Sequence, residues 1–165
     1  MGKKATKAAE NIFYVTRYQA SQENPSLSSR ENAAELLNID RTRLARIELG
    51  TTQPYPEEVI QMSKIYNAPE LCHLYCSMEC PLGKCTMSKV DITSDFDRLA
   101  LQVLGSFEHV TRLKSKLITI AEDGAITPDE EEDFDAVLEA LERLSSSAQS
   151  LKIWAEKNIR NKKSS

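Results

Sequence analysis

Apolar residues recur at three- and four-residue steps along most of this chain, the spacing of one face of an α-helix. The signal is longest between residues 91 and 160, where two such runs follow one another. The first consists of Ile92, Phe96, Leu99, Val103, Phe107, Val110, Leu113, Leu117 and Ile120, and the second of Phe134, Val137, Leu141, Leu144, Ala148, Leu151 and Ala155. The pattern predicts an all-α protein.

A break and a restart separate the two long runs. Asp123-Gly124 interrupts the first, and Thr127-Pro128-Asp129-Glu130 restarts the pattern with a capping box and a proline at the first helical position. We expect two helices of about thirty residues, each roughly 45 Å long, in an antiparallel hairpin. Such a hairpin alone leaves much of each apolar stripe in water. Pairing with the hairpin of a second subunit covers it, and the alternative is packing against the chain's own N-terminal part.

Two shorter helical patterns lie within Ala34–Gly50. Between them, Asn38 tolerates a left-handed backbone at a helix end, and Asp40 is a good N-cap. The apolar faces are formed by Ala33, Ala34 and Leu37 in the first pattern and by Leu44 and Ile47 in the second. The outer side of the second carries Arg41, Thr42, Arg43 and Arg46. This layout is typical of a helix-turn-helix, with a packed back and a basic face open to a DNA groove.

The order of residue types in this stretch resembles the Xre/Cro-type phage-repressor family. The matching positions are Ala34, Leu37, Asn38, Ile39, Asp40, Leu44, Ile47, Glu48 and Gly50. The resemblance extends over about Ala8–Leu71 and includes Pro54 and an amphipathic run, Glu57–Tyr66, similar to the family's fourth helix. Two departures affect the expected phosphate contacts. Arg30 stands where the family often has Gln, and Thr51 and Thr52 stand where it often has basic residues.

The resemblance implies a sequence-specific DNA-binding transcriptional regulator, most simply a dimeric repressor. The groove contacts are expected from Arg41, Thr42, Arg43 and Arg46, with arginine reading guanine edges. Contacts to the phosphate backbone are expected from Ser29, Arg30 and Thr52. A homodimer presenting two recognition helices about one DNA turn (~34 Å) apart reads a palindrome. The rival hypothesis is a protein-binding adaptor, such as an antitoxin, whose hairpin holds a partner.

Charge and hydropathy narrow these expectations. The net charge is −4, and residues 1–70 hold nine basic and nine acidic side chains, so DNA affinity must come from local clustering. No apolar run approaches the ~20 residues of a membrane span. The basic N-terminus lacks the apolar core of a secretory signal. Its Lys3, Lys4 and Lys7 fit a disordered, solubilising tail better than a basic arm that binds DNA. We expect a cytoplasmic protein without a membrane partner.

All four cysteines, Cys72, Cys76, Cys80 and Cys85, lie within fourteen residues. Such clustering indicates a metal or redox role more than structural disulfides. Cys72 and Cys76 are one helical turn apart, whereas Cys80 on a continuous helix would lie roughly 12 Å from Cys72. Pro81 and Gly83 offer a break that brings Cys80 and Cys85 back. Zinc, an iron–sulfur cluster, and buried or redox-active thiols without metal remain alternatives.

The patterns divide the chain into four parts. Residues 1–70 are expected to form the helix-turn-helix domain, 71–90 a cysteine-rich connector, 91–160 the dimerising hairpin, and 161–165 a disordered tail. No Gly-rich phosphate loop, nucleophile elbow or His-Glu metal motif is present. The sequence therefore favours a binding protein over an enzyme.

Overall fold

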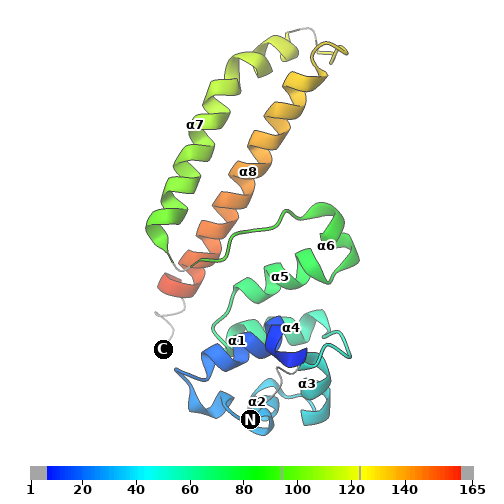
Figure 1. Ribbon diagram of the computed structural model, residues 1–165, viewed down its shortest axis with the longest axis vertical. Coiled ribbons are helices and arrows are strands. Elements are labelled where there is room, and N and C mark those ends of the chain that lie inside the picture. The colour runs from blue at the N-terminus through cyan, green and yellow to red at the C-terminus, as the bar shows by residue number, and fades with distance from the viewer. Residues whose placement is uncertain (1–6, 94, 123, 161–165) are drawn as a thin grey trace, which may run out of the picture. The chain divides into compact units, whose positions relative to one another are not determined.

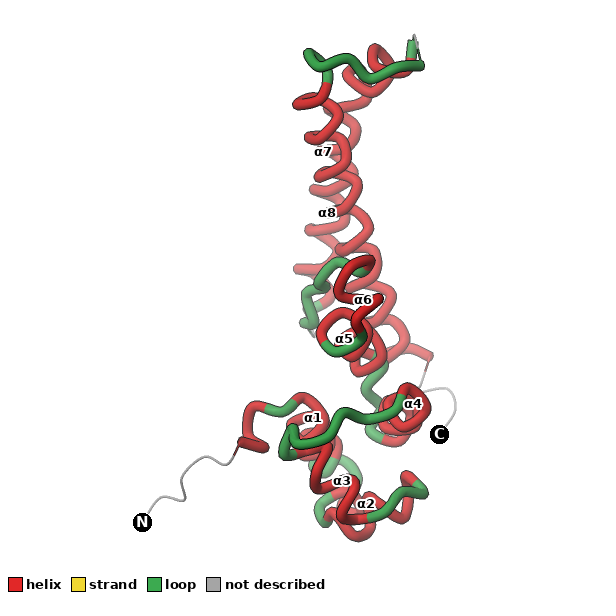
Figure 2. Tube along the Cα trace, turned by 90° about the vertical axis from the view of Figure 1, so that its right-hand side faces the viewer, coloured by secondary structure: helices red, strands yellow, loops and turns green. Residues whose placement is uncertain are grey.

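The computed structural model describes residues 7–93, 95–122 and 124–160, and these form eight α-helices and no strand. Figure 2 shows only helix and loop over these residues. The all-α fold class is confirmed. Lys3, Lys4 and the tail 161–165 lie outside the described residues.

The chain divides into two compact units, Met1–Met87 and Ser88–Ser165. The first unit contains α1 (Ile12–Ala20), α2 (Arg30–Leu37), α3 (Arg41–Glu48), α4 (Pro56–Ile65), α5 (Glu70–Met78) and α6 (Pro81–Thr86). Short 3₁₀ helices precede α1 and α2, at Lys7–Glu10 and Pro25–Leu27. The cysteine-bearing helices α5 and α6 thus belong to the first unit, and the boundary falls at residue 87 instead of enclosing a connector at 71–90.

The core of the first unit is assembled from α1 to α5, with Leu27 of the second 3₁₀ helix. It consists of Phe13, Leu27, Ala33, Ala34, Leu37, Leu44, Ile47, Val59, Met62, Tyr66, Ala68 and Leu71. Asn11 fixes the start of α1, since its Oδ1 accepts hydrogen bonds from the backbone N–H groups of Phe13 and Tyr14. The amide of the same Asn11 donates to the carbonyl of Ile47 at 3.0 Å. One side chain therefore caps α1 and links it to the end of α3.

The second unit is a long hairpin of α7 (Phe96–Ala121) and α8 (Glu131–Ala155), followed by a short π-helix, Glu156–Arg160. The two long helices run antiparallel and side by side (Figure 1). The prediction that Thr127 caps α8 and that Pro128 is its first helical residue was wrong. The backbone N–H and the hydroxyl of Thr127 both donate to Glu130 Oε2, at 3.0 and 2.8 Å, so this motif stabilises a turn, and the helix begins at Glu131.

The hairpin buries few apolar side chains. Those buried are Leu99, Ile120, Val137, Ala140 and Ile153, whereas Leu101, Leu104 and Phe107 on α7 are each more than half exposed. No helix in the described part of the chain is long and apolar enough to cross a membrane.

Candidate nucleic-acid interface

Helices α2 and α3 are joined by three residues, and each end is fixed by the residue type that the sequence suggested. Ser29 caps α2, with its Oγ accepting from the backbone N–H of Asn32 at 3.1 Å. Asn38 ends α2 in the left-handed region, with φ 54°. Asp40 then caps α3 by accepting from the backbone N–H groups of Thr42 and Arg43, at 2.7 and 3.0 Å. These hydrogen bonds lower the pKa of Asp40, and the one from the Arg43 backbone has the largest effect. The cap is therefore charged at neutral pH.

The outer side of α3 presents three of the four expected groove residues to solvent. Arg41, Thr42 and Arg46 are exposed, while Leu44 and Ile47 on the opposite side of α3 are buried in the core. The two arginines lie five residues apart on a helix of eight residues. The helix therefore has an apolar back and a basic front.

Arg43 is held by the neighbouring helix α4. Its Nε donates to Glu58 Oε1, and its Nη2 donates to Glu58 Oε2 at 2.8 Å. The guanidinium also lies 4.2 Å from the ring centroid of Tyr55, a cation–π contact. Burial raises the pKa of Glu58, but the hydrogen bond and charge of Arg43 outweigh burial and leave that pKa lowered. Both partners are thus charged, and Arg43 must leave this ion pair to contact a base.

A second, more buried ion-pair network joins α1, α2 and α3 at Glu48. Its carboxylate is fully buried and accepts from Arg17 Nε at 2.5 Å, Arg17 Nη2 at 3.2 Å and Arg30 Nε at 2.5 Å. Arg17 Nη1 also donates to the carbonyl of Leu27 at 2.7 Å. Glu48 directly follows the buried Ile47, and the sequence marks it only as part of the family pattern.

The three residues expected at the phosphate backbone are placed differently. Ser29 is exposed, at the N-terminus of α2. Arg30 is partly exposed, but its guanidinium is engaged by Glu48. The Thr52 backbone N–H donates to the carbonyl of Arg46 at 3.3 Å, as that of Thr51 does at 2.9 Å, so both threonines close the C-terminal end of α3. Ser29 precedes α2 and Thr52 follows α3, and the Arg30–Glu48 ion pair joins these two helix ends.

The four cysteines lie on two helices that meet at a sharp turn. Cys72 and Cys76 are on α5, Cys80 is the N-cap of α6, and Cys85 is near the end of α6. The break occurs where Pro81 was expected to place it. Gly83 allows the close approach, because a Cβ at this position would lie 1.9 Å from the carbonyl oxygen of Cys76.

The cysteine thiols are all free, and their environments differ. Cys72, Cys76 and Cys80 are partly buried, and Cys85 is exposed. Burial raises the pKa of the Cys76 thiol, and the neighbouring Cys80 and Cys72 raise it further. Across the described residues, no three His, Cys, Asp or Glu side chains are grouped as ligands of one metal ion. The helices bring Cys72, Cys76 and Cys80 into one neighbourhood without forming a coordination sphere.

No protein-family model matches the chain, and searches of curated proteins and of solved structures give no match either.

Proposed function

We propose that this protein is a sequence-specific DNA-binding transcriptional regulator that acts as a homodimeric repressor. The observation that carries the proposal is the outer side of α3, where Arg41, Thr42 and Arg46 are exposed on a helix whose other side is locked in the core. A rigid helix with arginines on its free side suits the DNA major groove, where arginine pairs with guanine.

The support of α3 also fits this proposal. Asn11 holds its last turn, Asp40 caps its first turn, and Glu48 connects it to α1 and α2. Rigid support fixes the direction in which exposed side chains project, which base recognition requires. Local clustering also agrees with the balanced charge of this part of the chain, since Arg41 and Arg46 concentrate positive charge on one helix.

Dimerisation is proposed to occur through one side of the hairpin. Leu104, Phe107 and Ile118 follow helical spacing on α7 and are 63, 55 and 51 % exposed. This side of α7 continues at Thr111 and Lys114, which share a shallow apolar hollow of about 210 Å³ with Leu141 of α8. Exposed apolar patches of this kind mark protein–protein contacts, and a second copy supplies the same apolar side in return.

The first test is selection of bound sequences from a random DNA library, followed by titration of the selected site at several salt concentrations. We expect one enriched palindromic motif. Arg41→Ala and Arg46→Ala should each weaken binding by about 1–3 kcal/mol and relax the preference for one base of the motif. Arg143→Ala, which removes an exposed arginine of the second unit, is the matched control and should leave binding unchanged. A library without any enriched motif, together with weak binding at physiological salt, would favour the adaptor hypothesis.

The cysteines add a second, separable proposal, in which Cys72, Cys76, Cys80 and Cys85 hold zinc or an iron–sulfur cluster. Thiolate ligands suit both groups. Their placement on two helices in one unit supports it. Metal and acid-labile sulfide analysis of protein purified without oxygen or chelator tests it, with Cys76→Ser as the variant expected to lose the metal. Protein free of metal and sulfide would leave the cysteines as packed thiols.

A further inference from the structure

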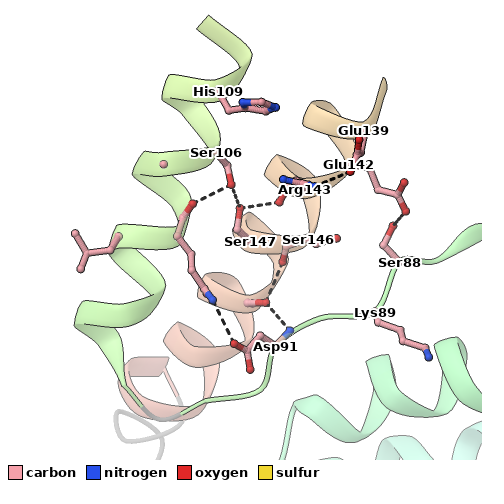
Figure 3. A pocket seen from close by; sticks show the side chains of 14 residues that line it. Ser88, Lys89, Asp91, Ser106, His109, Glu139, Glu142, Arg143, Ser146 and Ser147 are labelled. Atoms are coloured by element: carbon pink, nitrogen blue, oxygen red, sulfur yellow. Dashed lines mark hydrogen bonds and ion pairs between the residues drawn. The ribbon is translucent and has the colours of Figure 1, made fainter. Parts of the chain in front are cut away.

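A polar groove runs along the hairpin on the side away from its apolar patch. Its volume is about 640 Å³, within the range of about 300–1,000 Å³ that is typical of small-molecule sites. On α7 it is lined by positions at three- and four-residue spacing, among them Gln102, Ser106 and His109. Figure 3 shows Ser106 facing Ser147 of α8. None of the residues that line the groove lines the apolar hollow beside Leu141, so a dimer formed through the apolar side leaves the groove open.

The groove exists because small side chains leave unfilled space between two adjacent helices. Gly105 on α7 has open space where a Cβ would be. The hydroxyls of Ser106 and Ser147 meet across the two helices at 3.2 Å. The segment Ser88–Asp91 forms the remaining wall. Ser88 Oγ donates to Glu142 Oε1 at 2.8 Å, and the Asp91 N–H donates to Ser150 Oγ at 3.2 Å.

The carboxylates around the groove already have partners. Asp91 Oδ2 accepts from Arg98 at 2.8 Å and from Gln102 at 3.3 Å. Glu139 accepts from Arg143 at 2.6 Å, and Glu142 accepts from Ser88. The charge of Asp91 is offset by Arg98, so the lining is close to neutral overall.

The donors around the groove are less fully used. Within the described residues, Lys89, His109 and the hydroxyl of Ser146 line the groove without a hydrogen bond or ion pair to another side chain. These three side chains are donors available to a ligand, and one of them, Lys89, carries a full positive charge. Donors of this kind recognise the oxygens of an anion and its hydroxyl groups.

We propose that the groove binds a small hydroxylated anion, a carboxylate or phosphate of metabolite size, as the effector of the regulator. The effector role rests on the proposed DNA-binding function, whereas binding itself does not. Ser88 and Asp91 belong to the segment where the chain enters the second unit. A ligand in the groove can therefore act on the connection to the first unit through these two residues. A ligand that competes for Glu142 or Ser150 releases that segment from α8.

The binding test is isothermal titration calorimetry on the full chain without DNA, with citrate and glucose 6-phosphate as probes and glucose as the neutral control. We expect saturable binding of at least one anion with a Kd below about 1 mM and none of glucose. Lys89→Ala should weaken binding about tenfold or more, and Gly105→Leu should abolish it by filling the groove. Lys114→Ala, which lies on the apolar side of the same helix, should have no effect. The proposal is overturned if neither anion binds, or if anion binding survives Gly105→Leu.

Titration of the selected DNA site with and without the bound anion separates the two claims. A changed DNA affinity supports the effector role, and an unchanged affinity overturns that role while the binding site stands. If the protein binds the anion but the library selection enriches no DNA motif, the proposed regulator function is refuted and the anion site stands. DNA recognition without anion binding refutes the site alone.

Discussion

Glu48 of α3 and Arg17 of α1 form a buried, two-pronged ion pair, with Nε–Oε1 and Nη2–Oε2 distances of 2.5 and 3.2 Å. Burial lowers the pKa of Arg17, but the hydrogen bonds and charge of Glu48 outweigh it and leave the pKa raised. Arg17 is therefore charged in the interior. Arg30 supplies a third contact from α2, so this carboxylate joins the three helices α1, α2 and α3, which carry the proposed DNA-binding face.

Replacing Glu48 should therefore loosen the packing of α1, α2 and α3. Glu48→Ala leaves the Arg17 guanidinium buried without its charged partner, which destabilises a protein by about 3–5 kcal/mol. The measurement is hydrogen exchange at the amides of α1, α2 and α3, because two units need not unfold in one transition. Arg143→Ala, which breaks a pair that is 64 and 65 % exposed, should change exchange little. Equal protection in Glu48→Ala and the parent would refute the central role of this carboxylate.

The Asp40 cap makes the stability of α3 depend on pH. Its pKa is lowered below the ordinary value of 3.8, chiefly by the backbone hydrogen bond from Arg43. The charged cap therefore stabilises the fold fully above that ordinary value, and the contribution is lost as the pH falls through the lowered pKa. Asp40→Asn keeps a neutral N-cap. The stability difference between parent and variant should be present at pH 7 and vanish in acid, and a difference that is the same at both pH values would contradict this assignment.

Local signals predicted the helix ends well. Asn38 ends α2 with a positive φ, Asp40 caps α3, and Gly50 follows α3 with φ 69°. These helix ends depend on residues within one helical turn of each other, so they can be predicted from the sequence alone. Thr127 shows the limit of such signals. Its capping partner Glu130 is present, yet the pair stabilises a turn, and α8 starts at Glu131.

Contacts between helices could not be predicted from the sequence. Arg43 has the residue type and position of a groove contact, but Glu58 belongs to the next helix, fifteen residues away. Arg30 is similarly engaged by Glu48, eighteen residues away. The polar groove of the hairpin was also missed, because its serines occupy positions that periodicity alone assigns to an exposed face. Side-chain partners depend on helix packing, which the helical period does not specify.

Gly83 and Gly105 should respond in opposite directions to the same substitution. Gly83→Ala places a methyl group against the carbonyl of Cys76, so α6 must move away from α5 at a cost of about 1–3 kcal/mol. Gly105→Ala meets open space and should raise helix stability by about 1 kcal/mol. Thermal unfolding measures both changes. Alkylation of Cys76, slow in the parent because burial raises its pKa, should accelerate only in Gly83→Ala, and an unchanged rate there would mean that α6 is not held by this contact.

The apolar side of the hairpin should determine the oligomeric state. Leu104→Asp introduces a charge beside Phe107, and a charge in an apolar interface strongly disfavours association. Sedimentation velocity should show a dimer for the parent and a monomer for this variant. Leu101→Asp alters a residue that is 69 % exposed but lines the polar groove, so it should remain dimeric. A monomeric parent, or a dimer that tolerates Leu104→Asp, would contradict dimerisation through this side.

Glu58 should restrain DNA binding by holding Arg43. Glu58→Gln removes the charge that pairs with Arg43, while the remaining amide oxygen can still accept from the Tyr55 N–H, which lies 2.7 Å from Glu58 Oε2 in the parent. We expect this variant to bind the selected DNA site several-fold more tightly. We also expect a salt dependence steeper by about one released counterion if the freed arginine reaches a phosphate.

Two mechanisms give that gain, and Arg43→Ala separates them. If the freed guanidinium contacts DNA, the gain from Glu58→Gln disappears when Arg43 is replaced by alanine as well. If the gain instead comes from removing a negative charge near the phosphates, it persists in the double variant. The coupling free energy from the four titrations, which is non-zero only for residues that act together, therefore decides between the two. A value near zero would leave Arg43 as a residue that positions α3 against α4 and would assign the groove contacts to Arg41, Thr42 and Arg46.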